Sequence, residues 1–428
     1  MPDNTIEWGQ GAVNNTNDWG KAKANSTNNF GAVYDDSPSG DTNIAGGTGV
    51  ALSISYSASA FCEDASDPTP TVTGNVGAGT FSSTAGLVFV STTTGEVDID
   101  ASTSGATYVI TYTDTNAATA TFNLTINDLD DATFAYSDSA YRQDAADPTP
   151  TITGLTGGTF SAGSGLVFVD SGSNTGSSTG EIDLSASTIA SYTVTYTTAG
   201  TCPNTSTQTV GVVAALAQVN NVYSMEFDGV NDYVTMGNVL NTSSTGASAF
   251  SMSCWFKTSA SGGDQILIGK AKNSGQFDGY QLWINSTGEI WFFLGRYTGS
   301  AANSPWIYVK TTTTWNDGNW HNAVLTYNGN QNTSGLTLYV GGNTELLTSV
   351  HSNTPSISST DSEFMIGAKG KSGDVGLFFE GKIDEVSFFD VELTAQEAQS
   401  IYLATETGKT ADLDDLTTPP VKWYRMGN

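Results

Sequence analysis

The sequence predicts an all-β protein with several sandwich domains in a row. Only 13% of its 428 residues are charged, and Ser, Thr, Asn and Gly fill most polar positions. This composition is typical of β-structure with many turns. Polar and apolar residues alternate in short runs such as 108–113 and 336–340, which is the period-2 pattern of strands. The length allows several domains, each with its own core.

We expect an extended arm over residues 1–46. Trp8, Trp19 and Phe30 recur there at a spacing of 11 residues on a small, polar background. Such a repeat cannot bury its rings by itself. The arm is therefore either a solvated polar tail or a docking segment whose three rings insert into a partner, a role that suits aromatic anchors.

Residues 47–129 and 130–216 form a longer repeat, since the phrase at 56–70 matches that at 136–150. In the last matching strands, three residues share one face: Tyr108, Ile110 and Tyr112 in the first, Tyr192, Val194 and Tyr196 in the second. Short strands at regular spacing predict two small β-sandwiches. The repeats resemble the immunoglobulin-like modules of Bacteroidetes surface proteins and their phages.

Residues 217–403 carry five ordered phrases, at 225–234, 250–256, 320–329, 336–342 and 381–389. In this order they resemble the laminin-G-like, concanavalin-A-like jelly-roll family. The resemblance implies a jelly-roll sandwich, a fold that serves in lectins, adhesive modules, glycan-binding appendages and spacers.

The end of the chain is expected to hold one helix and one strand. Residues 390–403 form the helix, because Thr394 and Glu397 make a capping box. Residues 404–428 form a C-terminal tail with a final strand.

Charge and terminal sequence narrow the partners. The net charge is -29, and Arg142 is the only basic residue between Lys23 and Lys257. Nucleic acid and anionic membranes are therefore disfavoured. The first residues lack the basic and apolar regions of a secretory signal, and no apolar run is long enough to span a membrane. Outward-facing domains without an export signal are a familiar combination in bacteriophage virions, although a trimmed sequence would look the same.

No catalytic residues are predicted. The acids at 96–98 and 181–183 resemble the paired-acid strand of jelly-roll glucanases, but the second Glu is missing. Asp384 and Glu385 should point to opposite faces of a strand. His321 has no activated nucleophile beside it and suits a packed position. We therefore predict a protein that is not an enzyme.

Two further expectations follow from the resemblances. Related jelly rolls often hold Ca²⁺, which here implies Asp228 and Asp384, with Asp232, as oxygen ligands; alternatively these acids only cap turns. In the repeats, the usual cysteine pair is split, because Cys62 lies in one and Cys202 in the other. We therefore predict no disulfide.

Trp306 is the candidate glycan contact, together with Tyr297. It follows a Ser-Pro pair in a stretch that is rich in Gly, Ser and Asn, and loops are where binding residues concentrate. We expect Trp306 to be more exposed than the other tryptophans, whereas Trp283, Trp291 and Trp320 are assigned to core packing.

The sequence as a whole favours a non-enzymatic structural or adhesive protein at the surface of a phage virion, as a fibre or capsid decoration. Its arm would bind other virion proteins, its jelly roll would bind host-surface polysaccharide, and it would form a homo-oligomer. The alternative is a bacterial cell-surface adhesin or the carbohydrate-binding module of an exported enzyme.

Overall fold

The computed structural model describes residues 50–426, except 75–77, 273–277, 300–303, 358–360, 372 and 406. The docking residues Trp8, Trp19 and Phe30 lie outside this range. The protein is almost entirely β-structure, as the composition predicts. It divides into two compact units, residues 1–129 and 130–428. In the part that the structure describes, no helix is long and apolar enough to cross a membrane.

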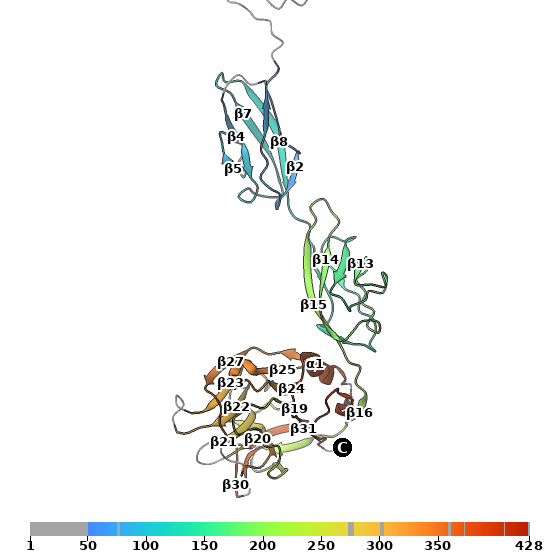
Figure 1. Cartoon of the computed structure of the whole chain (residues 1–428), viewed down its shortest axis with the longest axis vertical. Helices are drawn as coiled ribbons and strands as arrows, with labels where there is room; N and C mark the ends of the chain where they lie inside the picture. Colours follow the sequence, from blue (N-terminus) through green and yellow to red (C-terminus); the bar gives the residue numbers. More distant parts are fainter. Residues whose placement is uncertain are drawn as a thin grey trace, which may run out of the picture. The chain divides into compact units, whose positions relative to one another are not determined.

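Among the described residues of the first module, β2, β8, β7 and β4 form one sheet in that order (Figure 1). Strand β2 runs parallel to β8, and the other two pairs are antiparallel. The strands are β1 Ser53–Ser55, β2 Ala60–Cys62, β3 Thr71–Thr73, β4 Thr80–Ser83, β5 Val88–Ser91, β6 Glu96–Asp98, β7 Ala106–Thr113 and β8 Thr119–Asn127.

The second module repeats this plan with the sheet order β10-β15-β14-β12-β13, in which β10 runs parallel to β15. Its strands are β9 Phe134–Ala135, β10 Ala140–Arg142, β11 Thr151–Ile152, β12 Thr159–Ala162, β13 Thr175–Ser177, β14 Ala190–Thr197 and β15 Thr205–Val213. The predicted inward triplets of β7 and β14 are all buried.

Residues of the repeated phrase make equivalent hydrogen bonds in both modules. The hydroxyl of Tyr56 donates to the carbonyl of Gly95, as that of Tyr136 does to Gly180. The carboxylate of Asp67 accepts the backbone N–H of Ile99 at 2.9 Å, and Asp147 accepts that of Leu184 at the same distance. The repeated phrase therefore ties the first strands to the middle of each module.

The cysteines contradict the prediction that there is no disulfide. Cys62 and Cys202 are both disulfide-bonded, whereas Cys254 is a free, buried thiol. The prediction was wrong because a cysteine without a partner in its own repeat was taken to be reduced.

The third domain consists of two seven-stranded antiparallel sheets. One has the order β17-β31-β19-β24-β25-β26, with β33 paired to β31; the other has the order β18-β28-β20-β21-β22-β23-β27. The first sheet comprises β17 Met225–Asp228, β19 Phe250–Lys257, β24 Trp320–Tyr327, β25 Leu336–Val340, β26 Asn343–Thr344, β31 Glu380–Phe389 and β33 Lys422–Tyr424. The second comprises β18 Val234–Thr235, β20 Gln265–Ala271, β21 Asp278–Ile284, β22 Glu289–Arg296, β23 Trp306–Thr314, β27 Leu347–Ser352 and β28 Met365–Ile366.

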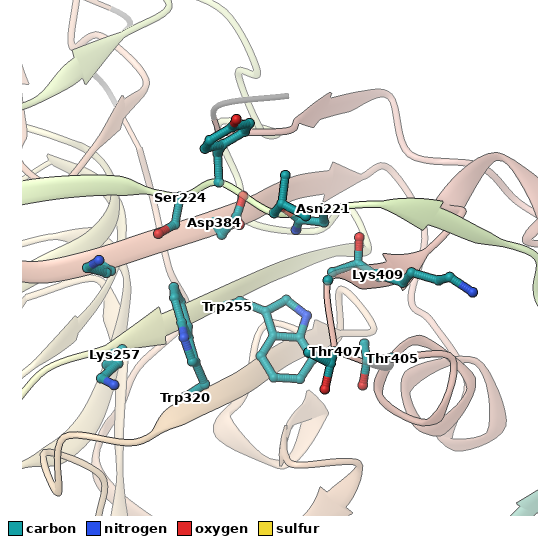
Figure 2. Close-up of a pocket in the computed structure, with 14 residues that line it drawn as sticks. Asn221, Ser224, Trp255, Lys257, Trp320, Asp384, Thr405, Thr407 and Lys409 are labelled. Atoms are coloured by element: carbon teal, nitrogen blue, oxygen red, sulfur yellow. The ribbon is translucent and has the colours of Figure 1, made fainter.

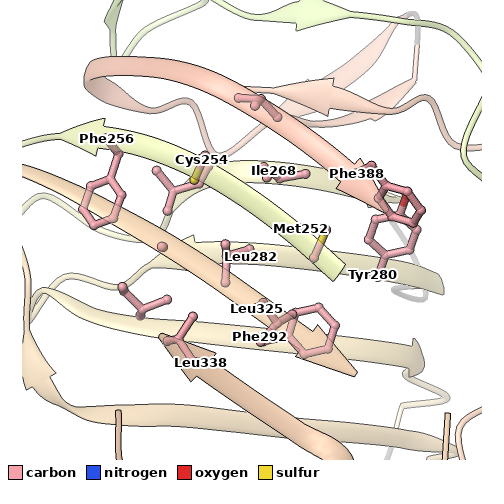
Figure 3. Close-up of a cluster of buried hydrophobic side chains, with 14 of the residues drawn as sticks. Met252, Cys254, Phe256, Ile268, Tyr280, Leu282, Phe292, Leu325, Leu338 and Phe388 are labelled. Atoms are coloured by element: carbon pink, nitrogen blue, oxygen red, sulfur yellow. The ribbon is translucent and has the colours of Figure 1, made fainter. Parts of the chain in front are cut away.

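Apolar side chains of both sheets meet in one continuous core (Figure 3). Alternate residues of each strand point inward, as the period-2 pattern predicts. Met252, Cys254 and Phe256 come from β19, and Leu282 and Phe292 face them from the other sheet. The free cysteine is therefore a core residue, and its burial raises the pKa of the thiol to about 12.

Smaller elements close the third domain. They are β16 Gln218–Asn220, β29 Lys369–Lys371, β30 Asp374–Gly376, β32 Lys409–Ala411, α1 Ala395–Leu403 and two 3-10 turns, Thr333–Gly335 and Leu413–Asp415. The helix has the predicted capping box of Thr394 and Glu397, but it begins at Ala395 and not at residue 390, because Thr394 is its N-cap. Ala398 and Ile401 of α1 are buried in a second cluster with Phe389 of β31, so the helix packs on the sandwich as expected.

Candidate functional site

Asp228 is the last residue of β17, and Asp232 lies in the turn that follows it. The backbone N–H groups of Val230 and Asn231 donate to the Asp228 carboxylate at 2.8 and 3.2 Å. The Asp232 carboxylate accepts the backbone N–H of Asp228 at 3.0 Å. These backbone hydrogen bonds lower the pKa of Asp228. The two acids therefore cap a turn, which is the alternative that the sequence left open.

Asp384 does not reach this turn. The register of β17 with β31 places Asp228 opposite Glu380 and Met225 opposite Ile383. Four residues along a strand span about 13 Å, so Asp384 and Asp228 do not ligate one ion together. The described residues contain no group of three His, Cys, Asp or Glu side chains that could hold a metal. The expected carboxylate set does not fit a shared calcium ion.

Trp306 differs from its predicted setting. It is the first residue of β23 rather than part of a loop, and it is half-buried. The most exposed tryptophan among the described residues is Trp320, at 39%. The expectation that Trp306 is the exposed one is therefore wrong. Tyr297 does lie near Trp306, as expected, because the centroids of the two rings are 5.1 Å apart.

Trp306 belongs to an apolar cluster on the outer face of the second sheet. The cluster contains apolar side chains of β21, β22 and β23 that point away from the core, together with Ile266 of β20. We call it the aromatic face, and it consists of Ile266, Trp283, Trp291, Phe293, Trp306 and Tyr308.

The cross-strand register stacks the rings of the aromatic face. Trp283 stands directly opposite Trp291, and Phe293 stands opposite Tyr308. The ring of Tyr308 lies 5.6 Å from that of Trp283 and 5.4 Å from that of Trp306, with interplanar angles of 16° and 19°. Three strands thus contribute to one stacked group, which ends at the half-buried Trp306.

Three buried polar atoms in or beside the aromatic face have no partner among the described residues. They are Gln281 Oε1, Trp291 Nε1 and Trp306 Nε1. Gln281 is 8% exposed and lies opposite Phe293 in register. A buried polar atom without a partner costs about 1–3 kcal/mol. Sequence analysis missed Gln281 and Tyr308, although both have the strand parity of Trp283 and Trp306.

His321, which the sequence assigns to a packed position, is paired with an acid, and so is Lys310 on the second sheet. The Nε2 atom of His321 lies 2.8 Å from Asp317 Oδ1, and its ring contacts Trp315. On the outer face of the second sheet, Glu289 is paired with Lys310 at 2.7 Å, and this contact lowers the pKa of Glu289. A carboxylate held ionised in this way is a poor general acid.

Comparisons with known proteins place the third domain but not the whole chain. The model of the family described as "Concanavalin A-like lectin/glucanases superfamily" matches residues 228–399. No curated protein matches the chain.

Several solved structures resemble part of the chain at low identity. A Ruminococcus gnavus IT-sialidase CBM40 bound to alpha2,3 sialyllactose is 15% identical and covers 43% of this chain and 97% of its own, with a TM-score of 0.33. A putative carbohydrate binding protein from Bacteroides ovatus is 13% identical and covers 69% and 90%, with a TM-score of 0.30. A heptameric SAP-like pentraxin from Limulus polyphemus is 13% identical and covers 41% and 80%, with a TM-score of 0.29.

These identities and scores carry no functional assignment. The family match and the two facing antiparallel sheets agree on the architecture. Residues 228–399 form a concanavalin A-like lectin-fold domain.

Proposed function

We propose that the third domain is a non-enzymatic glycan-binding module that holds a sugar on its aromatic face. The observation that carries this proposal is the stack of rings that ends at the half-buried Trp306, with Tyr297 beside it. A sugar ring offers an apolar C–H face that can stack on the exposed part of the indole. Ligand sites commonly combine aromatic walls with a few placed polar groups.

Binding without catalysis is favoured over glycoside hydrolysis. A retaining or inverting glycosidase needs two carboxyl groups on either side of the scissile bond, one of them with a raised pKa. Beside the aromatic face, burial raises the pKa of Asp264, which hydrogen-bonds with Trp283, whereas the contact with Lys310 lowers the pKa of Glu289. The stacked rings present a flat apolar surface, which favours recognition of a saccharide.

The proposal is tested by changing Trp306 to Ala in the full chain and measuring binding to a glycan array. We expect loss of at least about tenfold in affinity for the glycans that the unchanged protein binds, since the stacking surface is removed. Tyr233→Ala is the matched control, because Tyr233 is an exposed aromatic residue (40%) outside the aromatic face. Equal binding by both variants would reject the aromatic face as the site.

Trp306→Phe separates binding from folding. Phe keeps a ring against Phe293 and Tyr308 but lacks the indole nitrogen. We expect this variant to melt near the unchanged protein and to bind with intermediate affinity.

At the level of the whole chain, the proposed role is that of a phage virion appendage, a fibre or capsid decoration that meets host-surface polysaccharide. The support is the 11-residue aromatic spacing of the arm and the tandem β-modules before the lectin-fold domain. The arm would dock on other virion proteins, and the chain would act as a homo-oligomer. The rival role is that of a bacterial surface adhesin or the binding module of an exported enzyme.

Mass spectrometry of purified phage particles decides between these roles. A virion protein should be present in particles at a fixed copy number. A Trp8→Ala/Trp19→Ala variant should be lost from the particles if the rings dock the arm. Detection of the chain only in bacterial envelope or culture fractions would support the rival role.

A further inference from the structure

A pocket of about 570 Å³ lies in the third domain, and none of the residues that line it belongs to the aromatic face. Its floor is formed by β31, β19 and β24, and its walls by the segment 221–224 and by residues 405 and 407–410 (Figure 2). This volume lies within the range of sites for small molecules. We call it the lysine pocket, because Lys257, Lys382 and Lys409 line it.

Two of the lysines are direct cross-strand neighbours. Lys257 of β19 stands opposite Lys382 of β31 on one side and opposite Trp320 of β24 on the other. Like charges directly opposite each other destabilise an antiparallel pair. The chain has only 14 basic residues against 43 acidic ones, so three lysines at one pocket form a local positive field in an acidic protein. This arrangement is suited to an anion.

Two residues farther along the paired strands β19 and β31, the pocket floor contains a second indole ring, Trp255, and a carboxyl group, Asp384. Trp255 stands opposite Asp384 in register, and the ring of Tyr402 from α1 stacks behind it at 6.0 Å and 21°. Trp320, on the neighbouring strand, is exposed. Figure 2 shows both indole rings among the residues that line the pocket. Two rings beside a pair of ammonium groups match a molecule with one flat apolar face and one anionic group.

The acidic group that lies beside Lys382 pairs with it only weakly. Glu226 lies 3.9 Å from Lys382, but its side chain is 77% exposed, and such exposed pairs contribute little. Asp384 is buried, and this burial raises the pKa of its carboxyl. One Asp384 oxygen accepts the backbone N–H of Glu385 at 2.8 Å. Ser224, Thr405 and Thr407 add hydroxyl groups to the walls.

We propose that the lysine pocket binds an acidic sugar, with its carboxylate between Lys257 and Lys382 and its ring against Trp320 and Trp255. The wall hydroxyls and Asp384 would then meet the sugar hydroxyls. A polyanion such as nucleic acid fits less well, since the rest of the chain carries a strong negative charge that repels it. The pocket is independent of the glycan contact at Trp306.

The test uses the full chain and three probes: D-glucuronic acid, methyl D-glucoside and acetate. Ligand-observed NMR or calorimetry gives a dissociation constant for each. We expect glucuronate to bind at least about tenfold more tightly than the neutral glucoside and than acetate, and its affinity to fall as salt rises. Inorganic phosphate, measured in parallel, reports whether any small anion suffices.

Variants assign the effect to the pocket. Lys257→Gln/Lys382→Gln should abolish the preference for glucuronate over the glucoside, and Trp320→Ala should weaken both. Lys422→Gln, at an exposed lysine of β33 outside the pocket, changes charge in the same sense and should bind glucuronate as the unchanged protein does. The melting temperature of Lys257→Gln should be equal to or higher than that of the unchanged protein, because the like-charge contact is relieved.

Three results would overturn the proposal. Equal affinity for glucuronate and the glucoside would show that the lysines select nothing. Equal affinity for glucuronate and for acetate or phosphate would show that the rings contribute nothing. Unchanged glucuronate binding by Lys257→Gln/Lys382→Gln would place the ligand elsewhere. Trp306→Ala should bind glucuronate as the unchanged protein does, so a loss of array glycans by that variant concerns the aromatic face only.

Discussion

Glu385 accepts a hydrogen bond from the indole nitrogen of Trp423, which ties the last strand of the chain to a buried carboxylate. Its other carboxylate oxygen accepts one from the side chain of Asn221 at 3.0 Å. Glu385 has a positive φ of 48°, and the pairing of β31 with β19 is irregular at this point. The irregularity brings Asp384 and Glu385 to the same side of the sheet. The prediction that they point to opposite faces was therefore wrong.

The burial of Glu385 predicts a pH-dependent stability. Desolvation raises its pKa from 4.5 to about 7. Because the folded chain then holds this proton more tightly than the unfolded chain, its stabilising effect is complete below about pH 4.5 and is lost as the pH rises through 7. A shift of this size corresponds to about 3 kcal/mol.

Glu385→Gln removes the titration. Between pH 4.5 and 8, the free energy of unfolding should fall more steeply in the unchanged protein than in this variant, as followed by urea denaturation. Glu380→Gln, at an exposed position of the same strand, serves as the control. Parallel pH profiles for the unchanged protein and Glu385→Gln would contradict the raised pKa.

Backbone conformation at Gly279 predicts a strong effect of one methyl group. Gly279 has a φ of +138°, and a Cβ atom there would lie 1.9 Å from the carbonyl oxygen of Lys270. Gly279→Ala should cost more than about 2 kcal/mol of stability, since both strain and a backbone clash are introduced. Gly262→Ala, where the added atom would meet open space, should change stability by less than about 0.5 kcal/mol.

A matched pair of substitutions compares a core position of the third domain with an exposed position. Phe256 is fully buried between the sheets, whereas Val350 of β27 is 44% exposed. Phe256→Ala should cost about 3–5 kcal/mol through lost burial and a cavity, and Val350→Ala should cost less than about 0.5 kcal/mol. Tryptophan fluorescence during urea denaturation measures both, because every tryptophan of the described residues lies in the third domain.

The cysteines predict a stepwise thiol count. The native protein should react with no equivalent of a thiol reagent, because Cys254 is fully buried with a raised pKa. Unfolding without a reductant should expose one thiol, and reduction should bring the count to three. Three thiols before reduction would show that Cys62 and Cys202 are not bonded.

Local sequence was sufficient for the elements whose signals are local. Alternation in 108–113 and 192–197 fixed which residues face inward, because a strand turns successive side chains to opposite faces. The capping box of Thr394 and Glu397 set the start of the helix, because both hydrogen bonds lie within one turn. The ordered phrases of 217–403 indicated the correct fold of the third domain.

The tertiary structure alone decided which distant residues meet. The alternating pattern predicts toward which face of its strand each lysine side chain points. Only the pairing of β19 with β31 places Lys257 and Lys382 opposite each other. The same register separates Asp228 from Asp384. These outcomes depend on strand order and register, which arise from packing of the whole sandwich, and a shift of one residue would turn each side chain to the other face.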